Sequence, residues 1–508
     1  MEPLNGYTSI LVELILAVYV IAMLASLTSR IIAEVVTILA ASAGLVASLG
    51  IAYTVFMKGI TIPVLSKLLI VDPLAAWGLL TISIISTAAA IYSIGYLRSE
   101  RTHLNNTKFK WYYMLFNATM LAMVLSALSN NIVLLWAAIE ATTLATALLV
   151  GYHESTTSIE AAWKYVIICG IGVGFALFGT AIIYSSAVAS GLPAEDAMIW
   201  SSIIENHVYL AHSELLHLVK LGLLLVLFGY MAKAGLFPLH VWLPDAHAEA
   251  PVPISAILSG VIVKCALIGI LRYYAIANAL GLHEYTSKVL FATGVASMII
   301  GGLAVYVQRD IKRLFAYSTV DQVGVIATAM GIGTAMGILA AIMHILYHAL
   351  AKALAFLGSG LLVIFTKGRR DISDIGGLLR VRLKFTATVI TIAMLGIIAM
   401  PPGPSFFSKM YLFFAAADSG VPTAIIVLIG MLIAESALIY KLITIVYGGS
   451  KDTSTTAYKE KGLWSCKTAC IMLAVILVLL FILVKPYMGL AKIVVDEINS
   501  PMLYFSGP

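Results

Sequence analysis

The chain has 508 residues, of which 61% are hydrophobic and only 11% carry a formal charge. A soluble domain carries roughly 25% charged residues, so the composition excludes a water-soluble protein and indicates a chain that crosses a membrane many times. The net charge of +6 rests on few residues and forms no basic stripe with interleaved aromatic rings, which excludes nucleic-acid binding.

Apolar runs of about 20 residues, the length that crosses a bilayer, occur along the whole chain. They predict an all-α polytopic membrane protein with about fourteen transmembrane helices. The first run has no basic leader and no cleavage site, so we expect it to be retained as a span. The region 190–218 is expected to form an amphipathic or re-entrant segment against the bundle. The expected spans are 9–28, 31–57, 74–97, 111–129, 131–151, 161–189, 219–248, 252–276, 287–307, 313–333, 337–365, 386–414, 421–447 and 466–485.

Two lysines lie deep inside apolar runs, Lys233 in span 219–248 and Lys264 in span 252–276. A charge in hydrocarbon costs about 2.5–3.5 kcal/mol on insertion scales, so it usually faces a protein interior or a water-filled path. The region between the lysines is broken by prolines and holds Asp245 and His247, which we treat as auxiliary residues of such a path. A helix broken at membrane depth is tolerated where it lines a cavity.

The intramembrane features recur at an interval of five spans. Glu140 lies in span 131–151 and Asp321, a further auxiliary candidate, in span 313–333, while the break in 219–248 matches a second proline-rich break in 386–414. A unit repeated after an odd number of crossings is inverted, which is typical of transport proteins. We therefore predict N-terminal helices in 1–110, a first five-helix repeat in 111–276, a second, inverted one in 287–447, and a last helix with a short tail in 466–508.

His344, His348 and Lys352 recur every four residues in span 337–365 and therefore share one helical face. Two histidines at this spacing can bind zinc, but no third ligand is evident in the sequence. A proton wire is favoured over zinc binding and over structural polar packing, because histidine titrates near physiological pH. Glu140 and Lys233 are expected to pair, and the whole row is expected to form a polar axis: Glu140, Lys233, Lys264, His344, His348, Lys352 and Lys409.

The remaining polar residues suggest no second site. Asp72 before Pro73 is expected to cap a helix, and Glu435 lies near the end of an apolar run, where we assign it no role. Cys169 and Cys265 are expected to be small buried residues. Cys466 and Cys470 lack further ligands, so we expect no metal site, iron–sulfur cluster, haem or nucleotide site in this chain.

Lysine and arginine residues concentrate in the loops that follow odd-numbered spans, and such loops are usually cytoplasmic. Both termini are therefore expected on the extracytoplasmic side. The loop residues that decide this are Arg30, Arg98, Arg101, Lys108, Lys110, Arg309, Lys312, Arg313, Lys367, Arg369, Arg370, Arg380, Arg382, Lys384, Lys451, Lys459 and Lys461.

Several motifs resemble those of the antiporter-like membrane subunits shared by respiratory complex I, Mrp-type Na⁺/H⁺ antiporters and group-four membrane-bound [NiFe] hydrogenases. EAAWKYVII and RDIKRLFAYST are most similar to the membrane-bound hydrogenase and formate hydrogenlyase branch. The resemblance implies that the residues of the polar axis move ions. The other motifs are VDPLAAW, YSIGYL, LLWAAIEATTLATALL, KAGLFPLHVWLPDAHAEAPVPISAILSGVIVK, QRDIKRLFAYSTVDQVG, HILYHALAKALAFLGSG and GRRDISDIGGL.

The expected function is therefore translocation of protons, or exchange of Na⁺ for protons, by one subunit of a redox-driven complex in a prokaryotic plasma membrane. A subunit of a stand-alone Mrp-type antiporter and a non-pumping scaffold are the alternatives. A nickel–iron site, iron–sulfur clusters, flavin or quinone are expected only in partner chains. The expected partners are peripheral iron–sulfur or hydrogenase-type subunits and other antiporter-like and small membrane subunits. The few residues after 485 leave no room for a long lateral helix, which favours a shorter, middle-position subunit.

Overall fold

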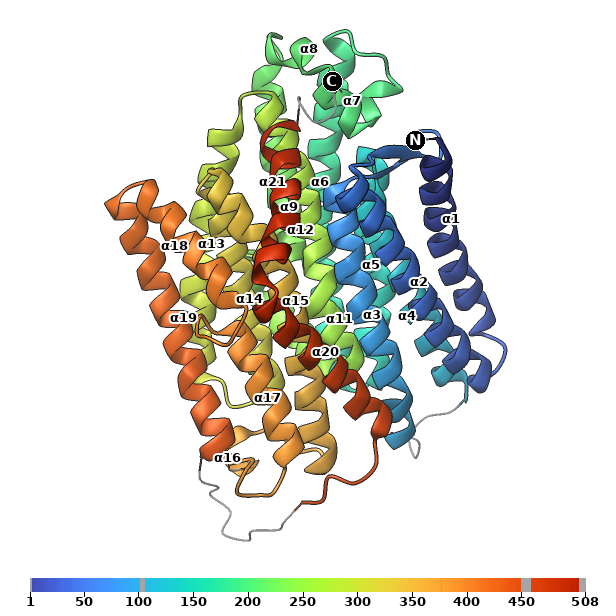
Figure 1. The fold of residues 1–508 in the computed structure, drawn as a ribbon, viewed down its shortest axis with the longest axis vertical. Helices are drawn as coiled ribbons and strands as arrows, with labels where there is room; N and C mark the ends of the chain where they lie inside the picture. Colours follow the sequence, from blue (N-terminus) through green and yellow to red (C-terminus); the bar gives the residue numbers. More distant parts are fainter. Residues whose placement is uncertain (1, 101–105, 376, 449–457, 502–508) are drawn as a thin grey trace.

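The computed structural model describes residues 2–100, 106–375, 377–448 and 458–501, so Arg101 and Lys451 lie outside the described residues. The long helices are α1 (Glu2–Ala25), α2 (Arg30–Lys58), α3 (Pro73–Ser99), α4 (Asn106–Leu128), α5 (Ile132–Val150), α6 (Thr156–Ala189), α9 (Leu216–Ala234), α12 (Val263–Ala279), α13 (His283–Val307), α14 (Ile311–Gly331), α15 (Ala335–Phe365), α17 (Lys384–Ile397), α18 (Ser405–Asp418), α19 (Val421–Tyr447), α20 (Trp464–Ile482) and α21 (Val484–Asn499). Figure 1 shows them as one bundle.

The predicted fold class is confirmed, because twelve helical segments within the described residues are long and apolar enough to cross a membrane. Two further predicted spans coincide with helices that are not among the twelve. Span 313–333 is α14, whose middle holds the polar residues Asp321 and Gln322, and span 386–414 is divided between α17 and α18, of 14 residues each. The count of fourteen, the inverted repeats and the domain limits stay predictions.

Both predicted helix breaks are present. The first lies between α9 and α10 (Trp242–Glu249). α9 ends at Ala234 and is capped by Gly235, whose φ of 74° is the left-handed conformation that glycine adopts without strain, and the short helix η4 (Leu239–Val241) follows. The second lies between Ile397 and Ser405, where three prolines interrupt the helical hydrogen bonding. Each break leaves backbone groups that side chains can reach.

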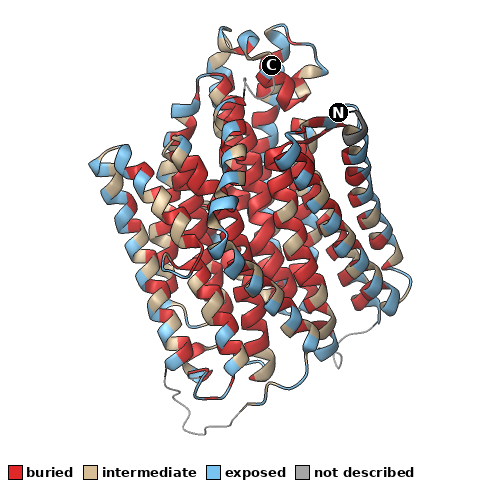
Figure 2. Ribbon diagram, viewed as in Figure 1, coloured by how far each residue is buried: buried red, intermediate tan, exposed pale blue. Residues whose placement is uncertain are grey.

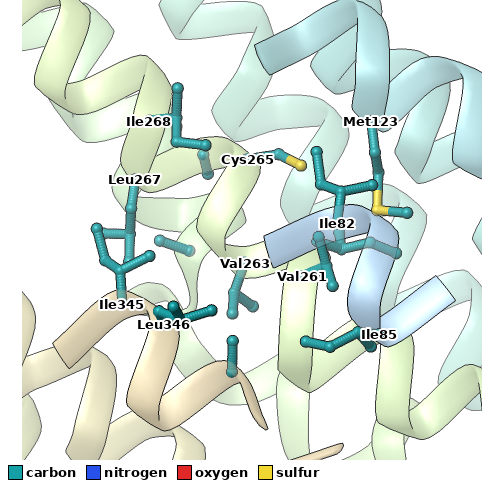
Figure 3. Close-up of a cluster of buried hydrophobic side chains, with 14 of the residues drawn as sticks. Ile82, Ile85, Met123, Val261, Val263, Cys265, Leu267, Ile268, Ile345 and Leu346 are labelled. Atoms are coloured by element: carbon teal, nitrogen blue, oxygen red, sulfur yellow. The ribbon is translucent and has the colours of Figure 1, made fainter. Parts of the chain in front are cut away.

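The interior helices are buried on nearly every side, whereas the outer ones, such as α1 and α19, expose one face (Figure 2). The short α11 (Val252–Ile257), the π-helical segment η5 (Leu258–Ile262) and α12 form one continuous buried rod. Figure 3 shows the apolar cluster around this rod, to which α3, α4 and α15 contribute. Its labelled members are Ile82, Ile85, Met123, Val261, Val263, Cys265, Leu267, Ile268, Ile345 and Leu346.

Close packing of α6 on α9 fixes the position of the first broken helix. A Cβ atom added to Gly179 would lie 2.4 Å from the Gly222 carbonyl oxygen, and one added to Gly229 would lie 2.4 Å from the Gly172 carbonyl oxygen. Small residues let helix backbones approach closely in membranes, where packing rather than hydrophobicity drives association. Larger residues here would push α9 away from α6.

Region 190–218 forms η3 (Asp196–Met198), α7 (Trp200–Glu205) and α8 (His207–Ala211), which are too short to span, as predicted. Two features were not predicted. Residues 62–71 form an antiparallel hairpin of β1 (Ile62–Val64) and β2 (Leu69–Val71), so the chain is not purely helical. The short tail after 485 is instead α21, an amphipathic helix that packs on α15, α12, α3 and α20.

Figure 1 places the start of α1 and the end of α21 at one end of the bundle, with α7 and α8. The short α16 (Ile372–Ile375), the end of α3 and the start of α4, next to which many of the basic loop residues lie, are at the opposite end. The two ends of the described chain therefore share one side of the bundle.

Candidate functional site

Lys233 lies in the last turn of α9, directly before the first break, and is completely buried. Its ammonium group donates one hydrogen bond to the Thr143 hydroxyl at 2.7 Å and one to the Tyr165 hydroxyl at 2.6 Å. A buried charge needs polar partners in place of water. Two neutral hydroxyl groups provide them here, and neither had been singled out from the sequence.

The structure brings Glu140 and Lys233 together through Thr143 rather than by direct contact. The Thr143 hydroxyl donates to Glu140 Oε2 at 3.3 Å, and among the described ion pairs none joins Glu140 to Lys233. Glu140 is half-buried on α5, on the side where Leu144 and Leu148 are exposed. A hydroxyl both donates and accepts, so this carboxylate–hydroxyl–ammonium series can pass a proton.

Aromatic rings hold the lysine site against the broken helix. Tyr165 stacks on Trp242 of α10, with ring centroids 4.5 Å apart, and Trp242 Nε1 donates to the Ala232 carbonyl at 2.9 Å. That carbonyl lies in the last turn of α9 and also accepts from the Gly235 N–H at 3.2 Å. Trp242 therefore joins α10 to the end of α9 and stacks on Tyr165, which contacts Lys233.

Lys264 follows the π-helical segment η5. Its ammonium group donates to the Ser259 carbonyl at 2.5 Å, and the Ser259 hydroxyl lies 2.7 Å from the Thr319 hydroxyl of α14. π-Helical segments change the direction of side chains within a helix and occur often at functional sites. This one places a carbonyl within reach of a lysine side chain of the same helix.

The predicted row on α15 is present, and all three side chains are buried. The rings of His344 and His348 are nearly parallel, at 5° with centroids 5.8 Å apart, as the spacing of four requires. Lys352, one turn further, donates to the Phe315 carbonyl at 2.8 Å and to the Ser318 hydroxyl. His348 has no hydrogen-bond partner on either ring nitrogen within the described residues, so its ring is available for exchange.

A hydrogen-bonded series surrounds His344. Its Nδ1 lies 2.9 Å from the Ser408 hydroxyl, and its Nε2 lies 3.0 Å from the Gln322 carbonyl oxygen. Gln322 in turn donates to Asp321 Oδ2 at 2.5 Å. The auxiliary residue Asp321 is therefore joined to the row through Gln322, which the sequence had not indicated.

Lys409 lies in the first turns of α18, after the second break. It is buried and donates to the Glu435 carboxylate of α19 and, at 2.8 Å, to the Ile397 carbonyl left free by the break. Glu435 also accepts from the Ala399 N–H at 2.9 Å. Glu435, to which no role was assigned from the sequence, lies in the middle of α19 and not near its end. A charge in the middle of an apolar helix was the signal that could have identified it.

The two auxiliary residues of α10 lie apart. His247 is buried between the rings of Trp242 and Phe356, with both ring nitrogens unpartnered within the described residues. Asp245 faces outward and pairs with Arg313 at 3.0 Å and Lys164 at 3.1 Å. Residues two apart point to different sides of a helix, so only His247 faces the interior.

Lys312, which was expected in a loop, binds the end of α10. It is buried at the start of α14 and donates to the carbonyls of Ala248 and Ala250 at 2.7 Å each. These carbonyls end α10, so the lysine caps the broken helix. It lies at the same end of the bundle as α16.

No group of three or more histidine, cysteine, aspartate or glutamate side chains in the described part of the chain could hold a metal ion. The four cysteines are free and buried, and Cys466 contacts the Tyr92 carbonyl of α3 at 3.4 Å.

The predicted axis consists of connected segments. Glu140, Thr143 and Lys233 form the first, and Lys409 with Glu435 forms the last. Between them, Lys264 and Lys352 reach neighbouring residues of α14, because Ser259 contacts Thr319 and Lys352 contacts Ser318. From Lys352 the row continues along the same face of α15 to His348 and then to His344, which lies beside Ser408 of α18.

The model of the family NADH:quinone oxidoreductase/Mrp antiporter, TM, matches residues 129–434, which include every residue of this axis except Glu435. The chain is 37% identical over 391 residues to the hydrogenase-4 component F homolog of Methylacidiphilum infernorum, covering 76% of this chain and 80% of that protein.

Two solved structures share the fold. One is the structure of the membrane-bound sulfane sulfur reductase, an archaeal respiratory membrane complex, with a TM-score of 0.84, 22% identity, and coverage of 98% of this chain and 99% of that chain. The other is the Mrp complex from Dietzia sp., with a TM-score of 0.83, 19% identity and the same coverage. These relatives belong to multi-subunit membrane complexes. The chain is an antiporter-like membrane subunit of the NADH:quinone oxidoreductase/Mrp antiporter family.

Proposed function

We propose that this chain translocates protons, or exchanges Na⁺ for protons, as one membrane subunit of a redox-driven complex of the membrane-bound hydrogenase or complex I type. The observation that carries the proposal is the set of buried lysine and histidine side chains at and between the two helix breaks, of which those around Lys264, Lys352 and His344 share polar partners on α14. Buried charges cost several kcal/mol each, so a bundle built only for support has no need of them. This argues against the non-pumping scaffold.

In this function the carboxylates set the charge state of the lysines. Lys233 is held by neutral hydroxyls, with Glu140 one hydroxyl away, while Lys409 contacts Glu435 directly. An approaching carboxylate strengthens the hold of a lysine on its proton, and a departing one weakens it. His348, without a fixed partner, passes protons between the lysine-bearing segments.

The redox chemistry belongs to partner chains in this proposal. A nickel–iron site, iron–sulfur clusters, flavin or quinone would be held there, in peripheral iron–sulfur or hydrogenase-type subunits, and further antiporter-like and small membrane subunits would lie beside this chain. The relative named hydrogenase-4 component F homolog supports this choice. The alternative, a subunit of a stand-alone antiporter, is supported by the fold shared with the Mrp complex.

Copurification of the intact complex, with identification of its proteins and metals, separates these two alternatives. Nickel and iron in stoichiometric amounts are expected. A complex that exchanges Na⁺ for protons and carries neither metal nor flavin would contradict redox coupling and support the stand-alone antiporter.

The proposed setting is the plasma membrane of a prokaryote, with both termini extracytoplasmic. The basic loop residues within the described part of the chain lie next to elements at the end of the bundle opposite the chain ends, as the positive-inside rule requires for this orientation. A periplasmic-type reporter fused to the C-terminus should be active, and a reporter that is active only in the cytoplasm would contradict the orientation.

A further inference from the structure

A second buried charge cluster lies outside the polar axis, at the end of the bundle that holds α7. Asp72 caps α3, as predicted, by accepting from the Ala75 N–H at 2.7 Å. Arg272 of α12 pairs with Asp72 and also with Glu497 of α21. All three side chains are at most 2% exposed. Neither Arg272 nor Glu497 was singled out from the sequence.

We infer that this cluster is a proton-binding site, in which Glu497 carries an exchangeable proton beside an ionised Asp72–Arg272 pair. The ligand is a proton taken from the aqueous phase at this end of the bundle. No residue of the polar axis takes part, so the inference goes beyond the proposed function.

Charge balance is the first argument. Two carboxylates share one guanidinium group, so the cluster would carry a net negative charge if both were ionised. An uncompensated charge in the interior is strongly unfavourable. Among the described residues, the charged groups that act on Glu497 are Asp72 and Arg272. A proton on one carboxylate therefore neutralises the cluster.

The contacts indicate which carboxylate holds the proton. Asp72 is bound in a bidentate manner, with Arg272 Nη1 at 2.5 Å from Oδ2 and Nη2 at 2.9 Å from Oδ1. Bidentate pairs of this kind are the strong ones. Glu497 receives only a share of the same Nη1, at 3.0 Å, and one backbone N–H, that of Leu74 at 2.9 Å. Glu497 is therefore the less stabilised anion.

One buried donor of the cluster has no protein partner among the described residues. Arg272 Nε is buried and has no acceptor within the described residues, although a buried donor without a partner costs about 1–3 kcal/mol. An oxygen ligand such as water would satisfy it and could bring the proton. The cluster also lies at helix ends: Asp72 precedes α3, and Glu497 is in the last turn of α21, which ends with the half-buried Asn499 and is followed by the exposed Ser500.

The test is infrared spectroscopy of the intact complex in lipid, comparing the carbonyl band of protonated carboxylic acids between wild type and variants. Glu497→Gln should remove one carboxylic-acid band per chain. Asp72→Asn should remove it as well, because Arg272 then has a single carboxylate partner and Glu497 ionises. The control Asp496→Asn, at an exposed neighbour on α21, should leave the band in place.

Loss of a band in Glu497→Gln, with the control unchanged, supports the site. If Glu497→Gln loses no band, the site is overturned, because Glu497 is then ionised; loss in Asp72→Asn alone would overturn it too, because the proton would then be on Asp72. If both variants fail to assemble, the wild type decides: a buried carboxylic-acid band that shifts in D₂O is expected, and its absence overturns the site. The measurement needs no transport, so it can fail while Lys233 still proves essential, and the reverse.

Discussion

The two lysines next to the helix breaks are bound in different ways. Lys233 contacts two neutral hydroxyls and is separated from Glu140 by Thr143, whereas Lys409 contacts the Glu435 carboxylate and a backbone carbonyl directly. We call the Glu140–Lys233 pair the open site, because a hydroxyl separates its charges, and the Lys409–Glu435 pair the closed site, because its charges are in direct contact. Separating a direct buried pair costs more than changing a bridged one, so the difference indicates that the first site is the easier one to switch.

The largest effect is expected for Lys233→Ala. It removes the ammonium group of the open site, so ion translocation by the complex in vesicles should be abolished while assembly is retained. Lys220→Ala is the matched control, because Lys220 lies exposed near the start of the same helix. Unchanged pumping in Lys233→Ala would refute the axis.

Glu435→Gln tests the closed site. It leaves Lys409 buried without its counter-ion, and breaking a buried pair costs about 3–5 kcal/mol. We expect a clearly lower thermal-unfolding midpoint of the purified complex. Glu140→Gln, which breaks no direct ion pair, should lower the midpoint much less; equal midpoints would remove the distinction between the two sites.

Thr143→Val tests the bridge. It keeps the shape of the side chain but removes the hydroxyl between Lys233 and Glu140, so the rate of proton transfer in vesicles should fall roughly tenfold, about 1.4 kcal/mol in the barrier. Thr143→Ser keeps the hydroxyl and should restore most of the rate. A Val variant as fast as wild type would mean that charge passes Lys233 without Thr143.

The smallest effect is expected for His348→Gln, because His348 lies between the two sites and not at either of them. A ring without fixed partners can be bypassed by water, so proton transfer should slow severalfold rather than stop. Metal analysis of the same variant is the control: loss of a bound metal would support the zinc alternative and contradict the proton wire.

The sequence predicted the helical class, both breaks and the buried row, because charges and prolines are conspicuous in apolar runs. It did not predict partners supplied by neutral residues. Thr143, Tyr165 and Gln322 are ordinary residues of a helix interior until tertiary packing brings them beside a lysine, a carboxylate or a histidine.

Other differences come from long-range contacts. Glu497 gains its partner Arg272 from 225 positions away, a distance at which no local pattern operates. The hairpin at 62–71 could not be predicted from the sequence, because each strand has only three residues, too few to show an alternating pattern of apolar and polar residues.

The π-helical segment η5 has a consequence for engineering. A π-helical turn is wider than an α-helical turn and accommodates one extra residue, so deleting one residue from 260–262 would convert the rod to regular α-helix. The residues on both sides would keep nearly their present orientation, while the Ser259 carbonyl would lie four positions before Lys264 instead of five. A one-residue deletion therefore changes the contact between Lys264 and Ser259 while leaving every lysine and histidine of the axis in the chain.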